Sequence, residues 1–186
     1  MSLLAAELGH RVTALDLSPG MLERARAKAR ERNLDVGFVV GSADQPPRGP
    51  FDAVIERHVL WTTPEPVRAL RAWLEAAPDG RLVLFEGTWN GTGARDRLRA
   101  RAADALRKLY RLTDDHHAPY EPEILTRLPL ARLSSPVPLI GAVTAAGWRA
   151  VRLHRLRDVE WARRAAAAPL LGLLEHVVRY AIVADA

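Results

Sequence analysis

The chain has 186 residues, of which 48% are hydrophobic, and it carries a formal charge of +5 at pH 7. This length and hydrophobic fraction are those of one soluble domain with a sizeable core. Cysteine is absent, which excludes disulfides, a thiolate nucleophile and a cysteine zinc site of the chain's own. No apolar run reaches the roughly 18 residues that span a bilayer, and no signal peptide is recognisable. We therefore expect a cytoplasmic protein with no membrane partner.

The basic residues do not indicate nucleic-acid binding. Only two of the 27 are lysines, Lys28 and Lys108, and the arginines are spread through many segments. A nucleic-acid footprint gathers on one face, with aromatic side chains for stacking. The densest arginine segments, residues 24–32 and 95–111, have the pattern of solvated faces of amphipathic helices. We expect no nucleic-acid partner.

The first half of the chain alternates between helices and strands. Helices are predicted over residues 2–8, about 19–32 and 64–77, and strands over 10–15 or 11–15, 35–40, 51–56 and 81–86. Ser18 and Pro19 supply an N-cap and a first-turn proline for the second helix. The strands are mostly continuous apolar runs, which is typical of a sheet covered on both faces. The pattern predicts an α/β fold with a Rossmann-like, doubly wound and mostly parallel sheet.

After Glu86 this alternation stops. A stretch rich in glycine and polar residues leads to an arginine-rich helix over 95–112, and residues 113–138 are rich in proline. This excursion is too long for a plain connection, so we expect a lid or substrate-facing insertion. A helix over 136–146, a strand over 148–156, a helix or loop over 159–168 and a strand over 176–183 follow. We expect one domain, 1–186, with a cofactor-binding half (1–87), an insertion (88–138) and a part that completes the sheet (139–186).

The candidate site lies where the strands end, because ligands of open parallel sheets bind beyond the carboxyl ends of the strands. Residues there are Asp16, the segment 41–44, the segment 56–58, and Glu86 with Gly87. A carboxylate such as Asp16 suits a ribose diol because it only accepts and takes two donors at once. Its alternative role is a helix-cap acid favoured by the helix dipole. The residue alone does not decide between the two.

Four segments together carry a family resemblance. LLAAELGHRVTALDLSPGMLERA, VVGSADQPP, GPFDAVIERHVLWTTPEP and APDGRLVLFEG follow one another from residue 3 to residue 87. In this order and spacing they resemble the class I S-adenosylmethionine-dependent methyltransferases, in the small-molecule branch (methyltransferase type 11) related to ubiquinone biosynthesis. A weaker likeness runs from residue 148 to the end. The resemblance implies S-adenosylmethionine as cofactor and methyl transfer to an oxygen, nitrogen or carbon nucleophile of a small-molecule acceptor.

The resemblance also assigns cofactor-binding roles. It implies that Asp16 holds the ribose hydroxyls, that Leu17 and Met21 flank the cofactor, that Ser42, Ala43 and Asp44 meet the adenine, and that Arg57 and His58 lie beside the methionine part. The family's first strand and its D-x-G-x-G loop should precede the helix over 2–8 and are not in this sequence. That strand would lie centrally, between those ending at Asp16 and Glu56. We therefore expect an N-terminally truncated chain whose cofactor binding and activity are impaired.

Catalytic and substrate-binding candidates follow from the same positions. His58 is the best-placed base, with a purely structural histidine as its alternative, and Glu86 either faces the substrate or pairs with an arginine. Trp61, Trp89 and Tyr120 are expected in the wall of the substrate pocket, unless they belong to the core. Residues 114–117, DDHH, do not have the ligand spacing of a metal site, so we expect no metal.

Two other classes of function stay open. One is a non-catalytic Rossmann-like remnant or interaction module. The other is a nicotinamide-dependent oxidoreductase, since an acid after the second strand is common to both cofactor classes. The two last strands argue against it, because they fit the antiparallel terminal pair of the methyltransferase family; a last strand parallel to its neighbours would remove this argument. The oligomeric state is open, with a homodimer as one option.

Overall fold

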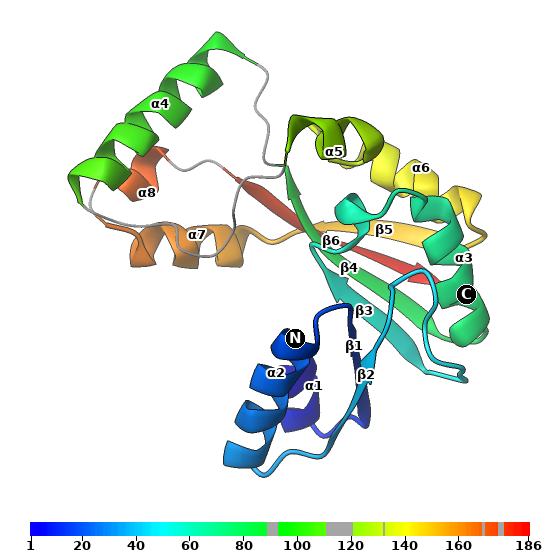
Figure 1. Ribbon diagram of the computed structural model, residues 1–186. Coiled ribbons are helices and arrows are strands. Elements are labelled where there is room, and N and C mark those ends of the chain that lie inside the picture. The colour runs from blue at the N-terminus through cyan, green and yellow to red at the C-terminus, as the bar shows by residue number, and fades with distance from the viewer. Residues whose placement is uncertain (89–92, 111–120, 132, 169, 175–176) are drawn as a thin grey trace.

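The computed structural model describes residues 1–88, 93–110, 121–131, 133–168, 170–174 and 177–186. The strands are β1 (Val12–Asp16), β2 (Val36–Val40), β3 (Ala53–Arg57), β4 (Arg81–Thr88), β5 (Arg149–Arg155) and β6 (Val178–Asp185). The helices are α1 (Ser2–Glu7), α2 (Pro19–Glu31), the 3-10 turn η1 (Leu60–Thr62), α3 (Pro66–Ala76), α4 (Ala94–Leu109), α5 (Pro122–Arg127), α6 (Val137–Ala145), α7 (Arg157–Ala166) and α8 (Leu171–Leu174). Figure 1 shows their arrangement.

The strands pair in two groups. β1 and β2 form a parallel pair, and the other four form a sheet in the order β3-β4-β6-β5, which we call the larger sheet. β3 and β4 are parallel, whereas β6 runs antiparallel to both of its neighbours. The predicted α/β fold with a mostly parallel sheet and an antiparallel terminal strand is confirmed. The antiparallel course of β6 also meets the condition on which the argument against an oxidoreductase depended.

The helices begin and end near their predicted bounds, with two differences of note. The helix expected from Pro64 begins at Pro66, and residues 60–62 form a 3-10 turn instead. Two closely spaced prolines explain this, since the residue before a proline is disfavoured in the α conformation. The proline-rich part of the expected insertion, for which no helix was predicted, contains α5, with Pro122 in its first turn. The segment expected as helix or loop is the helix α7.

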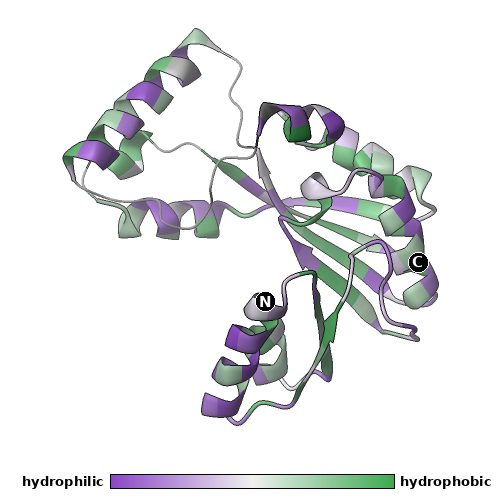
Figure 2. Ribbon diagram, viewed as in Figure 1, coloured by the Kyte–Doolittle hydropathy of each residue, from purple (hydrophilic) through white to green (hydrophobic). Residues whose placement is uncertain are grey.

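The core lies between the larger sheet and the helices α3 and α6. Leu70, Leu82, Leu139 and Ile182 are fully buried there. Figure 2 shows hydrophobic residues along the strands of this sheet and polar residues along α2, α4 and α7. The indole of Trp148 is buried and donates to the Leu70 carbonyl at 2.9 Å, which is the packing role expected for it. Burial of these side chains supplies the main stabilising free energy of the fold.

The N-terminal unit, consisting of α1, β1, α2 and β2, has little core of its own. It buries only Ala14, Leu22 and Ala29, and α1 buries no residue at all. Large apolar side chains are exposed to solvent instead: Leu4, Leu8, Leu17 and Met21 are 54%, 71%, 70% and 53% exposed. Within the described ranges, no strand pairs with the second edge of β1 or of β3. The strands are therefore interrupted between β1 and β3 (Figure 1).

In the described part of the chain, no helix is long and apolar enough to cross a membrane.

Candidate functional site

Asp16 is the last residue of β1, and one of its two carboxylate oxygens accepts a hydrogen bond. Oδ1 accepts a hydrogen bond from the backbone N–H of Ser18 at 2.8 Å, while the Ser18 hydroxyl caps α2 by accepting from Met21 N–H at 3.3 Å. Oδ2 bonds to no residue that the structure describes. The local bond aims the carboxylate and leaves one oxygen open, so the cap interpretation and the ligand interpretation are compatible.

The segment after β2 is hydrogen-bonded to α3, the helix that packs on the larger sheet. The Asp44 carboxylate accepts from the Ser42 hydroxyl through Oδ1 and from the Arg68 guanidinium through Oδ2. The Ser42 hydroxyl bond, followed by the charge and hydrogen bond of Arg68, holds the pKa of Asp44 below its usual range. The Ala43 carbonyl accepts from the Trp73 indole at 2.6 Å. The segment thus carries an ionised acid in a fixed position.

Arg68 was not predicted from the sequence to be a site residue. It is 24 residues away from Asp44, and no local pattern connects a surface arginine of one helix with a loop after another strand. Leu17 and Met21, expected to flank the cofactor, are apolar and exposed at the end of β1 and the start of α2. Both are available to cover a ligand.

His58 directly follows β3 and has an unusual backbone conformation. Its φ is 57°, in the left-handed region that a non-glycine residue enters at a cost of about 1 kcal/mol or more. Its N–H donates to the Phe85 carbonyl at 3.3 Å. Arg57, the last residue of β3, is exposed. His58 thus lies beside the end of the neighbouring strand β4, since Arg57 pairs with Phe85.

The two candidate catalytic residues meet at this point. Nδ1 of His58 lies 3.0 Å from Oε2 of Glu86, whose side chain is 6% exposed, while the His58 side chain is 21% exposed. The partner of Glu86 is therefore a histidine rather than an arginine. A buried carboxylate behind a partly exposed imidazole is an arrangement that can orient a general base.

Glu56 and Tyr180 stand behind this pair and were given no role in the sequence. Oε2 of Glu56 accepts from the N–H groups of Val59 and Leu60 at 2.8 and 3.3 Å. Burial, followed by the charge of Glu86, raises the pKa of Glu56 to about 8. Burial and both carboxyl groups raise the pKa of Tyr180 to about 12. Glu56 is visible in the sequence as a strand-end acid, but its depth in the core is not.

The substrate-binding candidates are only partly described. Trp61 lies in η1, is half-buried and packs against the core cluster. Trp89, Tyr120 and the DDHH segment at 114–117 lie outside the described residues. Among those that are described, no group of three potential ligands could hold a metal ion.

Comparison with known proteins bears on the first half most directly. Residues 1–84 match the family described as a methyltransferase domain. A ubiquinone biosynthesis O-methyltransferase from Xanthomonas campestris pv. campestris (strain B100) is 35% identical over 109 residues, which are 56% of this chain and 44% of that protein. The namesake from Caulobacter vibrioides is 33% identical over 90 residues, 47% of this chain and 35% of that protein. The chain thus spans less than half the length of these curated relatives.

Solved structures extend the likeness to the whole fold. A SAM-dependent methyltransferase from Methanosarcina mazei superposes with a TM-score of 0.64 at 18% identity, covering 100% of this chain and 86% of that one. The chain therefore has the fold of the S-adenosylmethionine-dependent methyltransferases, and its first 84 residues are similar to the methyltransferase domain family. The fold alone does not fix the reaction, because the [4+2]-cyclase SpnF superposes with a TM-score of 0.63 at 19% identity, covering 98% of this chain and 68% of that one.

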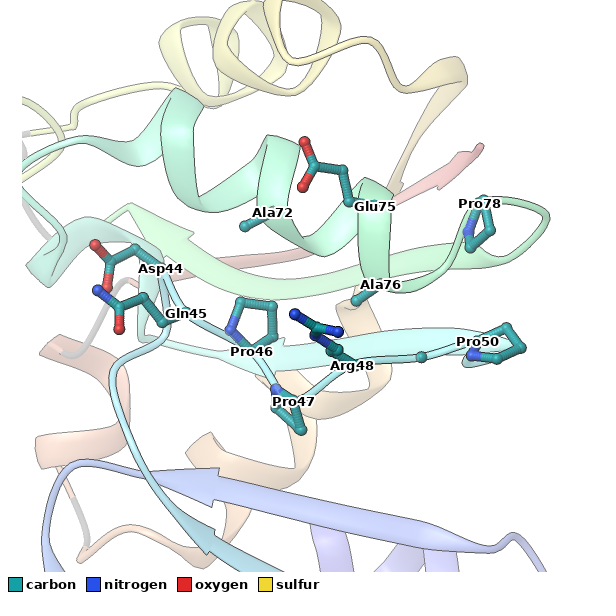
Figure 3. Close-up of a pocket in the computed structure, with 11 residues that line it drawn as sticks. Asp44, Gln45, Pro46, Pro47, Arg48, Pro50, Ala72, Glu75, Ala76 and Pro78 are labelled. Atoms are coloured by element: carbon teal, nitrogen blue, oxygen red, sulfur yellow. The ribbon is translucent and has the colours of Figure 1, made fainter.

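A pocket that the described residues line lies apart from the His58–Glu86 pair. This pocket, of about 600 Å³, lies between the loop 44–50 and α3 (Figure 3). Of the predicted site residues only Asp44 lines it, while Asp16, His58 and Glu86 do not. The loop approaches the helix so closely that a Cβ on Gly49 would lie 1.9 Å from the Ala76 carbonyl oxygen. We assign this pocket to the packing of the loop and not to the methyltransferase site.

Proposed function

We propose that the protein transfers a methyl group from S-adenosylmethionine to a small-molecule nucleophile, with His58 as general base and Glu86 as the group that orients it. The observation that carries this proposal is the 3.0 Å contact between the two side chains at the carboxyl ends of β3 and β4. In this fold, that end of the sheet is where ligands bind. The strained backbone of His58 supports a functional role, since such strain is concentrated at functional sites.

The residues present fit the proposed cofactor on one side. Asp16 offers an unbonded carboxylate oxygen to the ribose hydroxyls, and Ser42, Ala43 and Asp44 form a fixed segment for the adenine. Leu17 and Met21 supply exposed apolar cover, and Arg57 and His58 would border the methionine part. When bound, the cofactor supplies an activated methyl on a cationic sulfur, whose leaving group is a neutral thioether.

The His58–Glu86 pair indicates an acceptor that loses a proton. An ionised carboxylate only accepts hydrogen bonds, so beside it Nδ1 carries the hydrogen, and Nε2 is the nitrogen that takes up a proton. Such a base helps a hydroxyl nucleophile, which must lose its proton to attack. The relatives named as O-methyltransferases favour the same class. We infer an oxygen nucleophile on a small molecule, with Trp61, Trp89 and Tyr120 as pocket-wall candidates.

We further propose that one more parallel strand belongs between β1 and β3. Both edges are unpaired in the described structure, and the N-terminal unit leaves Leu4 and Leu8 uncovered. A strand there would join the two groups into one sheet and cover apolar surface, at about 25 cal/mol per Å². A segment upstream of the printed sequence, with the D-x-G-x-G loop that the resemblance implies, would supply it. Without it, cofactor binding and activity are impaired.

Three expectations from the sequence stay proposals: a single domain in three parts, a cytoplasmic location, and no nucleic-acid partner. A homodimer stays an option. The non-catalytic interaction module is the second function, and the exposed apolar residues of the N-terminal unit are what favours it. The antiparallel course of β6 favours a methyltransferase over a nicotinamide enzyme.

A methyl-transfer assay tests the proposal. The protein, extended at its N-terminus by the proposed strand and loop, is incubated with S-adenosylmethionine carrying a labelled methyl and a panel of phenols, amines and carbon acids. We expect label in the hydroxyl-bearing compounds, and loss of transfer in His58→Ala. Transfer to tertiary amines alone, or undiminished transfer by His58→Ala, contradicts the role of His58.

A further inference from the structure

Three buried polar atoms near His58 have no hydrogen-bond partner in the described part of the chain. They are Oε1 of Glu56, Oε1 of Glu86 and the hydroxyl of Tyr180. The residues are 6%, 6% and 2% exposed. Buried polar atoms are nearly always bonded, and each exception calls for an explanation.

The strand register places all three on one face of the larger sheet. Glu56 pairs with Leu84 on β4, and Glu86 is two residues further along that strand, so both carboxyl groups point to the same side. Glu86 in turn is directly opposite Tyr180 on β6. Three neighbouring strands therefore contribute one titratable group each to a single buried cluster.

Counting donors shows what the cluster lacks. One oxygen of each carboxyl group already has a hydrogen-bond partner. Glu56 accepts from two backbone N–H groups, and Glu86 is bonded to His58. The two remaining oxygens are acceptors when ionised, and Tyr180 brings a single O–H donor. One acceptor is then left over, and two negative charges share a dry site. One additional proton on a carboxyl group removes both problems.

We propose that Glu56 and Glu86 hold one proton between them at neutral pH, resting on Glu56, with the Tyr180 hydroxyl completing the network. Resting on the proposed function, this makes Glu56 a positioning residue for the base. Glu56 stays neutral so that the single negative charge of the cluster sits on Glu86, against Nδ1 of His58. The backbone N–H groups of Val59 and Leu60 fix the Glu56 carboxyl group in place.

The proton balance of the reaction follows. With the cofactor bound, the acceptor's O–H proton would pass to Nε2 of His58 as its oxygen forms a bond to the methyl carbon. The bond from that carbon to sulfur would break, with its electron pair going to sulfur. The resulting imidazolium faces one carboxylate rather than two or none, so the pair is neutral overall. Its proton then leaves to solvent through the exposed part of the His58 ring. The proton on Glu56 stays where it is.

The electrostatic surroundings agree with this assignment. The titratable groups that face Glu56 are Glu86 from β4, Tyr180 from β6 and, beyond Glu86, His58. No cation acts on Glu56 in the described structure. Burial and the Glu86 charge raise the pKa of Glu56 to about 8, as expected for a carboxyl group that keeps its proton at neutral pH.

Infrared spectroscopy of the chain as it stands tests the proposal. A protonated carboxyl group has a carbonyl stretching band that a carboxylate lacks. At pH 7 we expect one buried carboxylic acid band, which disappears in Glu56→Gln and also when the pH is raised through about 8. Glu160→Gln is the control, because Glu160 is equally buried but ion-paired with Arg155. No band at pH 7, or a band unchanged in Glu56→Gln, overturns the proposal.

A second variant guards against misfolding of the first. Tyr180→Phe keeps the ring and removes the only donor left over in the cluster, so the midpoint at which the Glu56 band disappears should move to higher pH. If the midpoint pH of the Glu56 band does not change, the proposed network is contradicted.

The nitrogen NMR shifts of His58 should show a hydrogen on Nδ1 in the wild type. In Glu86→Gln we expect the hydrogen to leave Nδ1, because the cluster sets the tautomer of His58. The same shifts in both proteins would contradict this role of the cluster. These readouts need no cofactor, so they separate failure of the network from failure of the proposed function.

Discussion

Nδ1 of His58 and Oε2 of Glu86 are 3.0 Å apart, although 28 residues separate them in the chain. Parallel pairing of β3 with β4 creates this contact, since it aligns the ends of the two strands. His58, the residue after β3, continues this register opposite Glu86 and has a left-handed backbone. The pair is therefore a product of the sheet register.

The first prediction concerns Glu86. In a form of the protein that transfers methyl groups, Glu86→Gln should lower kcat by about 100-fold, because an amide neither fixes the useful tautomer nor stabilises the imidazolium. The KM for the acceptor should change much less. Steady-state kinetics measure both, and Glu75→Gln, on the exposed side of α3, is the control. A full-rate Glu86→Gln enzyme would return Glu86 to a structural role.

Glu56 should make stability depend on pH. The pKa of Glu56 is about 8 in the folded protein against an ordinary value of 4.5, so between these values the folded state binds a proton that the unfolded state has lost. Its stabilising contribution is complete below pH 4.5, and the free energy of unfolding falls by about 1.4 kcal/mol per pH unit across the window. Urea unfolding at pH 6, 7 and 8 measures this slope. The slope should be shallower in Glu56→Gln by that amount, and equal slopes would contradict the assignment.

Asp16 can be separated from its capping role by two variants. Asp16→Ala should weaken binding of S-adenosylhomocysteine at least tenfold in a binding-competent form, which is about 1.4 kcal/mol. Ser18→Ala removes the cap of α2 and should cost about 1 kcal/mol of stability without changing the affinity. Calorimetry and thermal unfolding measure the two quantities. Equal affinity losses in both variants would mean that Asp16 acts only through the helix start.

Glu160 should hold α7 against the sheet. Its buried carboxylate accepts two bonds from Arg155 at 3.0 and 3.1 Å and one from the Arg179 N–H at 2.9 Å. The Arg155 bonds, with burial opposing them, hold the pKa of Glu160 below its usual range. Glu160→Ala removes the acceptor of these three bonds and should cost about 2 kcal/mol in urea unfolding. Because the pKa is lowered, this contribution is lost as the pH falls, so the variant's deficit should shrink in acid; a constant deficit would contradict the ion-pair account.

Much of the fold is local enough to be predicted from the sequence. Continuous apolar runs mark β1 to β4, and Ser18 with Pro19 marks the start of α2. The site could be predicted only in position, because strand ends are visible in a sequence while pairings across strands are not. The Arg68–Asp44 ion pair and the approach of Tyr180 to Glu86 both join residues that no short-range pattern connects. The sequence shows Glu56 as an acid at a strand end, but its burial depends on helices and strands that follow later in the chain and pack against it.

Interruption of the sheet between β1 and β3 leads to the most direct test of the central claim, that this is a cofactor-binding methyltransferase domain completed by one more strand. Calorimetric titration with S-adenosylhomocysteine would compare the chain as printed with a form extended by the proposed strand and D-x-G-x-G loop. We predict clear binding by the extended form, and much weaker or no binding by the printed chain. Binding by neither form would contradict the claim.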